Sequence, residues 1–191
     1  MNLPNVLTLS RIFFAGVLVF LLEGRSSTGN ILAVIVFAIA SFTDFYDGHL
    51  AKKRGLVSDF GKIMDPVADK ILLLSVFGVL AHIARIEWWM FIVIAIREIL
   101  VTLSRLWAMR HGQVIAAERA GKIKTVVQII AVSSILLYLA AQQSDYYSSW
   151  FYNFQSIWLG VNHALMLVAV ILTIYSGIEY FRNKSKIGVV K

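Results

Sequence analysis

The chain has 191 residues, contains no cysteine and is poor in charge. The absence of cysteine excludes disulfide bonds, thiolate metal sites and thiol catalysis. Charged residues make up 15% of the chain, whereas about a quarter is usual in a soluble domain. The N-terminal segment lacks a basic start and a small-residue cleavage site, so we expect no cleaved signal peptide. Together these shortages favour a membrane protein.

Apolar residues are what the chain has in excess, at 59% of the sequence with a mean hydropathy of +0.75. A helix needs about 20 mostly apolar residues to cross a bilayer, and the sequence offers six such stretches and little else. We therefore predict one all-α membrane domain over residues 1–191, a polytopic protein with a short interfacial helix at Met1–Ser10. The expected spans are Arg11–Leu22, Ile31–Ala51, Phe60–Ile83, Trp88–Met109, Gly121–Ala141 and Ile157–Phe181.

The basic residues lie at the ends of the apolar runs and not in one patch. The net charge of +7 and the pI near 9.8 therefore indicate anionic lipid or a phosphate-bearing substrate, not nucleic acid. Lysine and arginine gather in the 52–54 connection and at the tail, whereas the opposite connections hold only Arg25, Arg85 and a polar, aromatic loop at 142–153. The positive-inside rule then places both termini in the cytoplasm, and a bacterial inner membrane is the expected location.

Four aspartates form the most informative motif. Asp44 and Asp47 are three residues apart, and Asp65 and Asp69 are four apart, so each pair lies on one face of its predicted helix. The two helices form an antiparallel hairpin that turns near Gly55. At 1.5 Å per residue, both pairs lie on the order of 12–20 Å from that turn. We therefore expect four carboxylates to meet in the cytoplasmic half of the membrane.

Such a cluster requires positive charge. One carboxylate at membrane depth costs about 2.5–3.5 kcal/mol on insertion scales, and four also repel one another. Nearby lysines could neutralise them, but oxygen-rich clusters are typical sites for Mg²⁺ or Mn²⁺. Two such ions would balance four carboxylates and could clamp a diphosphate. In the plainer interpretation the aspartates only cap helices or pair with lysines, as we expect of Asp59 alone.

Small residues continue the two acidic faces: Gly48 and Ala51 on the first, and Gly61 on the second. They allow a ligand to approach the backbone closely, although tight helix packing in lipid has the same requirement. With Lys52, these residues resemble the signature of the CDP-alcohol phosphotransferases, D-x-x-D-G-x-x-A-R, seven or eight residues, then G-x-x-x-D-x-x-x-D. Lys52 stands where that family has arginine, so the charge is kept without the bidentate fork.

Further stretches are similar to one branch of that family, the phosphatidylglycerophosphate synthases. They are LPNVLTLSRI at the start, MDPVADKILL after the motif, and residues 96–125. The resemblance implies transfer of a phosphatidyl group from CDP-diacylglycerol to glycerol 3-phosphate, with release of CMP, by a protein that is commonly a homodimer. It implies that all four aspartates ligate two metal ions and that Asp69 is the general base. The cytidine diphosphate site would comprise Asn5, Thr8, Gly48, Ala51, Lys52 and Gly61.

The acceptor is a dianion, so its pocket needs fixed cations. Arg97 lies in the middle of a predicted span, where a charge is costly. Glu98 is adjacent in sequence but does not share its helical face, so local pairing is not the obvious explanation for this charge, and Glu98 is a candidate only to orient Arg97. Arg105 lies two turns further on, and two lysines open the next span at a comparable level. We therefore predict a phosphate-binding group of Arg97, Arg105, Lys122 and Lys124, although snorkelling or positive-inside placement would also explain these residues.

Two other functions remain open. The same chemistry could serve another acceptor, such as inositol phosphate or serine, because the aspartate motif does not distinguish among them. A divalent-cation transporter is a candidate of a different class, since intramembrane carboxylates can form an ion pathway. The stretch after Asp69, ILLLSVFGVLAHI, has no carboxylate, which argues against transport.

Overall fold

A computed structural model describes the backbone of residues 3–54, 59–111, 119–142 and 149–187, and the side chains of residues 10–43, 70–109, 111, 120–142 and 154–183. The described residues form six α-helices and no strand. The helices are α1 (Leu3–Glu23), α2 (Ser27–Arg54), α3 (Asp59–His82), α4 (Trp88–Arg110), α5 (Arg119–Gln142) and α6 (Ser149–Ile187). The predicted all-α class is confirmed.

Two tight connections show why the chain reverses where it does. After α1, Arg25 takes a positive φ of 47°, and after α3, Ala84 takes a φ of 57°. Both residues end a helix in the left-handed conformation that commonly terminates helices. Ser26 then caps α2, because its hydroxyl accepts a hydrogen bond from the Gly29 backbone N–H at 3.0 Å. Each of the two reversals is thus completed within a few residues.

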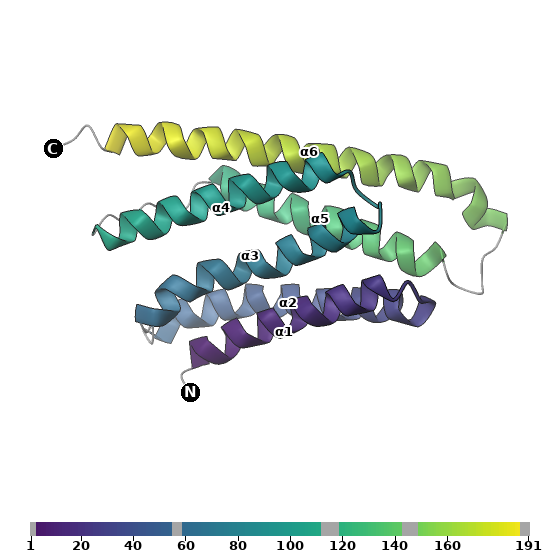
Figure 1. Cartoon of the computed structure of the whole chain (residues 1–191), viewed down its shortest axis with the longest axis horizontal. Helices are drawn as coiled ribbons and strands as arrows, with labels where there is room; N and C mark the ends of the chain where they lie inside the picture. The colour runs from purple at the N-terminus through teal and green to yellow at the C-terminus, as the bar shows by residue number, and fades with distance from the viewer. Residues whose placement is uncertain (1–2, 55–58, 112–118, 143–148, 188–191) are drawn as a thin grey trace.

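The helices run alternately up and down the long axis of the molecule (Figure 1). α1 packs against both α2 and α3, α2 packs against α5, α3 against α4, and both α4 and α5 against α6. The beginnings of α1, α3 and α5 and the ends of α2, α4 and α6 lie at the same end of the bundle, on the left in Figure 1. The start of the first helix and the end of the last therefore share one end of the molecule.

Large apolar side chains fill the inside of the bundle and also cover its outside. Leu18, Phe77 and Leu136 are buried, whereas Phe20 and Ile178 are 77% and 64% exposed. Exposed apolar surface of this extent is unusual for a soluble monomer and is typical of lipid contact. Two helical segments are long and apolar enough to cross a membrane, Ala120–Gln142 and Phe154–Asn183, and Ser27–Thr43 and Lys70–His82 are shorter apolar stretches.

Two predicted helix boundaries are not seen. α1 is one continuous helix from Leu3 to Glu23, with no break between the predicted interfacial helix and the first span. The stretch from Asn5 to Ala15 has neither glycine nor proline to interrupt it. Likewise, α6 begins at Ser149, inside the predicted 142–153 loop, since no helix breaker occurs before Gly160.

Candidate functional site

The acidic motif lies on two helices, α2 and α3. Asp44 and Asp47 belong to the second half of α2, and Asp65 and Asp69 to the first half of α3. These parts of α2 and α3 lie at the same end of the molecule (Figure 1). Because the backbone is helical at all four positions, each pair occupies one face of its helix.

The side chains of the motif lie outside the described residues. This applies to the four aspartates and to the six positions predicted for the cytidine diphosphate site, Asn5, Thr8, Gly48, Ala51, Lys52 and Gly61. The backbone at all ten positions is helical, on α1, α2 or α3. Among the side chains that are described, no three acidic, histidine or cysteine residues gather into a metal site. Convergence of the four carboxylates therefore stays a prediction.

A buried charge cluster begins one residue after the motif. Glu98 on α4 is 3% exposed, and its carboxylate receives cations from three helices. Lys70 of α3 lies 2.9 Å from Glu98 Oε2. Lys124 of α5 contacts Oε1, and Arg97 Nη1 lies 3.4 Å from the same oxygen. The cluster thus joins the acidic helix α3 to α4 and α5.

Three cations around one carboxylate leave this cluster with a formal net charge of +2. Charge buried within a membrane bundle is costly unless it is paired, and removing one partner of a buried pair costs about 3–5 kcal/mol. Among the described side chains, Glu98 therefore stabilises a cluster that has more positive than negative charge and can receive an anion.

Arg97 is held from two sides. Its Nη2 donates a hydrogen bond to Ser176 Oγ of α6 at 3.0 Å, and its Nη1 contacts the Glu98 carboxylate. The side chain crosses α6 at Gly177, where an added Cβ would lie 3.2 Å from Arg97 Cγ. Glu98 therefore contacts Arg97, as suggested by its place in the sequence, because the long arginine side chain reaches across the difference in helical face.

The other two predicted acceptor residues are not in the Glu98 cluster. The Arg105 guanidinium carbon lies 5.5 Å from the centre of the Tyr180 ring, a cation–π contact between α4 and α6. Its buried Nε has no hydrogen-bond partner among the described residues. Lys122 is exposed. Of the four predicted cations, the structure brings Arg97 and Lys124 to one carboxylate.

The sequence alone does not identify Lys70 and Ser176 as parts of this group, and it suggests Glu98 only as a partner of Arg97. Lys70 is one of the lysines near the aspartates, where the sequence indicates a charge that could neutralise them. The available signal was Glu98 itself, since an acidic residue in the middle of an apolar run implies a buried partner. Helical spacing gives neighbours on one helix, and these contacts join different helices.

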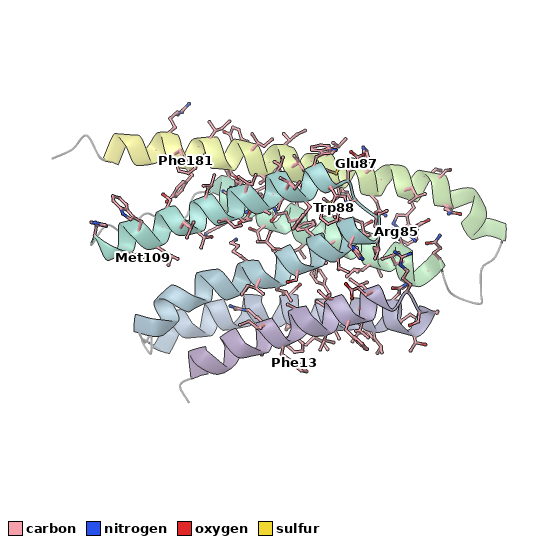
Figure 2. The ribbon with its side chains drawn as sticks, in the orientation of Figure 1. Phe13, Arg85, Glu87, Trp88, Met109 and Phe181 are labelled. Carbon is pink, nitrogen blue, oxygen red and sulfur yellow. The ribbon has the colours of Figure 1, made fainter. Side chains whose placement is uncertain are left out.

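Arg97 also lines a cavity of about 640 Å³ between α4 and α6. The rest of its lining is almost wholly apolar and includes Leu100, Ile174 and Ile178. Figure 2 shows Phe181 and Met109 toward the end of the bundle at which α2 ends and α3 begins, and Arg85 and Glu87 toward the opposite end. Arg97 therefore lies between the buried cluster and an apolar, outward-facing groove.

Comparisons with known proteins agree with the signature in α2 and α3. The family model for CDP-alcohol phosphatidyltransferases matches residues 1–175. The chain is 38% identical to the CDP-diacylglycerol–glycerol-3-phosphate 3-phosphatidyltransferase of Bacillus subtilis, over 94% of this chain and 93% of the relative. It is 34% identical to a probable phosphatidylglycerophosphate synthase of Mycobacterium tuberculosis, over 94% of this chain and 79% of that one. A Rickettsia typhi protein with the same name as the Bacillus relative is 32% identical, over 95% and 96% of the two chains.

Proposed function

The chain belongs to the CDP-alcohol phosphatidyltransferase family, and we propose that it transfers the phosphatidyl group of CDP-diacylglycerol to glycerol 3-phosphate. The products are phosphatidylglycerol phosphate and CMP. The names of relatives that are 32–38% identical over most of the chain support this activity. Inositol phosphate and serine are the acceptors against which the proposal is to be tested.

The observation that carries the choice of acceptor is the cluster around Glu98. It has a formal charge of +2, and it begins at Lys70, directly after Asp69 of the motif. Glycerol 3-phosphate is a dianion that needs fixed cations close to the reacting centre. A free amino acid such as serine brings no such charge. The cluster therefore favours a phosphorylated alcohol.

We propose that Asp44, Asp47, Asp65 and Asp69 hold two divalent ions, Mg²⁺ or Mn²⁺. Four carboxylates are the hard oxygen ligands that these ions prefer, and the helical backbone puts each pair on one face. Two bound ions would neutralise the diphosphate and stabilise the charge that develops as its bond to CMP breaks. The protein would contribute by holding the end of α2 and the beginning of α3 at this end of the bundle.

The remaining residues of the motif have roles on the two substrates. Gly48, Ala51, Lys52 and Gly61, with Asn5 and Thr8 of α1, would line the cytidine diphosphate site. The small side chains permit close approach to the backbone, and Lys52 supplies one positive charge. Asp69 would accept the proton of the attacking glycerol hydroxyl as this oxygen bonds to the phosphorus of the phosphatidyl group.

The acceptor phosphate would bind near the four predicted cations Arg97, Arg105, Lys122 and Lys124, of which Lys124 is buried behind Glu98 and would act through it. Arg97 presents a planar fork that suits phosphate oxygens, and Ser176 and Glu98 orient it. Arg105 lies two turns along the same helix, against Tyr180. Lys122 is exposed at the start of α5, where it could attract the dianion from water.

We propose that the whole chain is one domain in the inner membrane, with six spans and both termini in the cytoplasm. All six helices and their apolar outer surface support this arrangement, as does the greater number of basic residues in the connections at the end of the acidic motif. The active site would then open to the cytoplasm, where a water-soluble acceptor enters. A homodimer is the assembly that the family resemblance implies.

An acceptor panel tests the proposed function. Purified protein in detergent receives CDP-diacylglycerol and Mg²⁺ with glycerol 3-phosphate, inositol phosphate or serine, and the lipid products are separated. We expect phosphatidylglycerol phosphate and an equal amount of CMP with the first acceptor only. Efficient transfer to one of the other acceptors, with none to glycerol 3-phosphate, would contradict the proposal.

A further inference from the structure

The Glu98 carboxylate contacts cations from three helices, and the proposed function uses it only as a partner of Arg97 and Lys124. We propose that Glu98 is a positioning residue: its carboxylate fixes Lys70 and Arg97 as the cations that receive the acceptor phosphate, with Lys124 as the counter-charge behind it. This inference rests on the proposed function and assigns the parts of its acceptor site.

The exposure of the four side chains separates their tasks. The Lys70 side chain is 28% exposed and that of Arg97 is 13% exposed, whereas the side chains of Lys124 and Glu98 are 1% and 4% exposed. Lys70 and Arg97 thus keep part of their surface open, but Lys124 is sealed inside the bundle. Lys124 acts on the acceptor through Glu98, by balancing the carboxylate that orients the other two cations.

The contacts of Glu98 also fix the separation between the proposed proton acceptor and the phosphate-binding cations. Its Oε2 holds Lys70 of α3 at 2.9 Å, and Lys70 follows Asp69, the proposed proton acceptor. Its own helix, α4, contributes Arg97. The hydroxyl and the phosphate of glycerol 3-phosphate are at opposite ends of a three-carbon chain. The proton acceptor and the phosphate-binding cations must therefore keep a fixed separation, which the contact between Lys70 and Glu98 maintains.

Substitution by the neutral isostere tests this role. In Glu98→Gln the three cations repel one another without a carboxylate between them, so Lys70 and Arg97 no longer face one point. We expect the KM for glycerol 3-phosphate to rise about tenfold or more, while the KM for CDP-diacylglycerol stays within about twofold. Glu23→Gln, an exposed acid-to-amide change at the opposite end of the bundle, is the matched control.

A second variant removes the sealed cation. Lys124→Met puts an apolar side chain of similar length in a buried position. On its own it should raise the KM for glycerol 3-phosphate and leave the KM for CDP-diacylglycerol within about twofold, so it provides a test even if Glu98→Gln does not fold. If Lys124 acts through Glu98, the double variant has a KM for the acceptor no higher than that of the worse single variant. The proposal would be overturned if the KM of the double variant rose by the product of the two single effects. Equal changes in the KM for both substrates would also overturn it.

Anion binding can be measured without turnover, which separates this inference from the proposed function. The melting temperature of the purified protein is followed as inorganic phosphate is added. We expect phosphate to raise it in the wild type, and Glu98→Gln to need about tenfold more phosphate for the same rise. If the wild type has another acceptor but keeps this shift, only the proposed substrate is wrong. Equal phosphate responses in the two proteins would overturn the role of Glu98.

Discussion

Asp69 and Glu98 carry the same functional group and have different tasks in this account. The Glu98 carboxylate is buried among three cations, so it is saturated with donors and serves to orient them. Asp69 lies on α3 in the acidic motif, where a second helix contributes two more aspartates. A carboxylate that faces metal ions and a substrate hydroxyl can accept a proton, and one that is enclosed by ammonium and guanidinium groups serves as an anchor.

The role of Asp69 as general base gives the first prediction. Asp69→Asn removes the proton acceptor, so turnover should fall roughly 10²–10⁴-fold while the variant still folds and binds CDP-diacylglycerol. Steady-state rates and binding of the lipid nucleotide measure the two effects separately. Asp59→Asn is the control, since Asp59 begins α3 outside the motif and asparagine caps a helix as well as aspartate does. Near-normal turnover in Asp69→Asn would remove it from the role of base.

Arg97 gives the second prediction at this scale. Arg97→Ala removes a guanidinium that is held by Glu98 and Ser176. Hydrogen bonds to charged groups contribute about 1.5–3 kcal/mol each, so the KM for glycerol 3-phosphate should rise roughly tenfold or more. The KM for CDP-diacylglycerol should change little. Equal rises for both substrates, measured in the same assay, would indicate a structural role.

At the scale of helices, long apolar runs made most of the fold predictable. The predicted bounds of the helices that became α3, α4 and α5 differ from the observed ones by two residues or fewer, because polar connections interrupt the runs sharply. The start of α6 was predicted eight residues too late. Residues Ser149–Asn153 are polar and aromatic, which suggested a loop, and yet nothing in them breaks a helix.

The site was less predictable than the helices. Spacing along one helix identified the acidic faces, because side chains three or four residues apart are neighbours, and the cost of a charge within an apolar span identified Arg97. It could not show that Lys70, Glu98 and Lys124 meet, since that contact depends on how three helices pack. The Arg97–Ser176 hydrogen bond joins residues 79 positions apart, and no local rule foresees it.

The close approach of α4 to α6 gives a prediction at this scale. In Gly177→Ala the new Cβ would lie 3.2 Å from Arg97 Cγ, so the Arg97 side chain must shift slightly, which disturbs its contacts with Ser176 and Glu98. Overpacking of this kind typically costs about 1–3 kcal/mol, and we expect a several-fold rise in the KM for the acceptor together with a lower melting temperature. Gly160→Ala is the matched control on the same helix, because a Cβ there meets nothing within 4 Å. Equal effects of the two substitutions would contradict the role given to Gly177.

At the scale of the molecule, one end of the bundle holds the residues to which the proposed function assigns the chemistry. α2 ends and α3 begins there. Along α3, the motif aspartates come first and the contact of Lys70 with Glu98 follows them. The opposite end carries exposed Trp88 and Trp89 beside Arg85, a combination typical of a membrane interface. This polarity suits an enzyme whose lipid substrate stays in the bilayer while its second substrate arrives from water.

The absence of cysteine makes this orientation directly testable. Single variants Arg25→Cys and Glu87→Cys introduce one thiol each in the connections at one end, and Arg182→Cys introduces one near the other end of the bundle. In intact cells, we expect a membrane-impermeant thiol reagent to label the first two variants. Arg182→Cys should be labelled only after the membrane is opened. The reverse pattern would contradict cytoplasmic termini.

Metal-dependent phosphatidyl transfer is the claim on which the account depends, and chelation tests it most directly. The measurement is CMP release by the purified wild-type protein with CDP-diacylglycerol and glycerol 3-phosphate, before and after treatment with EDTA, and again after Mg²⁺ is restored. We predict that release falls at least about a hundredfold on chelation and recovers with Mg²⁺, since the ions neutralise the breaking diphosphate. Unchanged CMP release after thorough chelation would contradict the account.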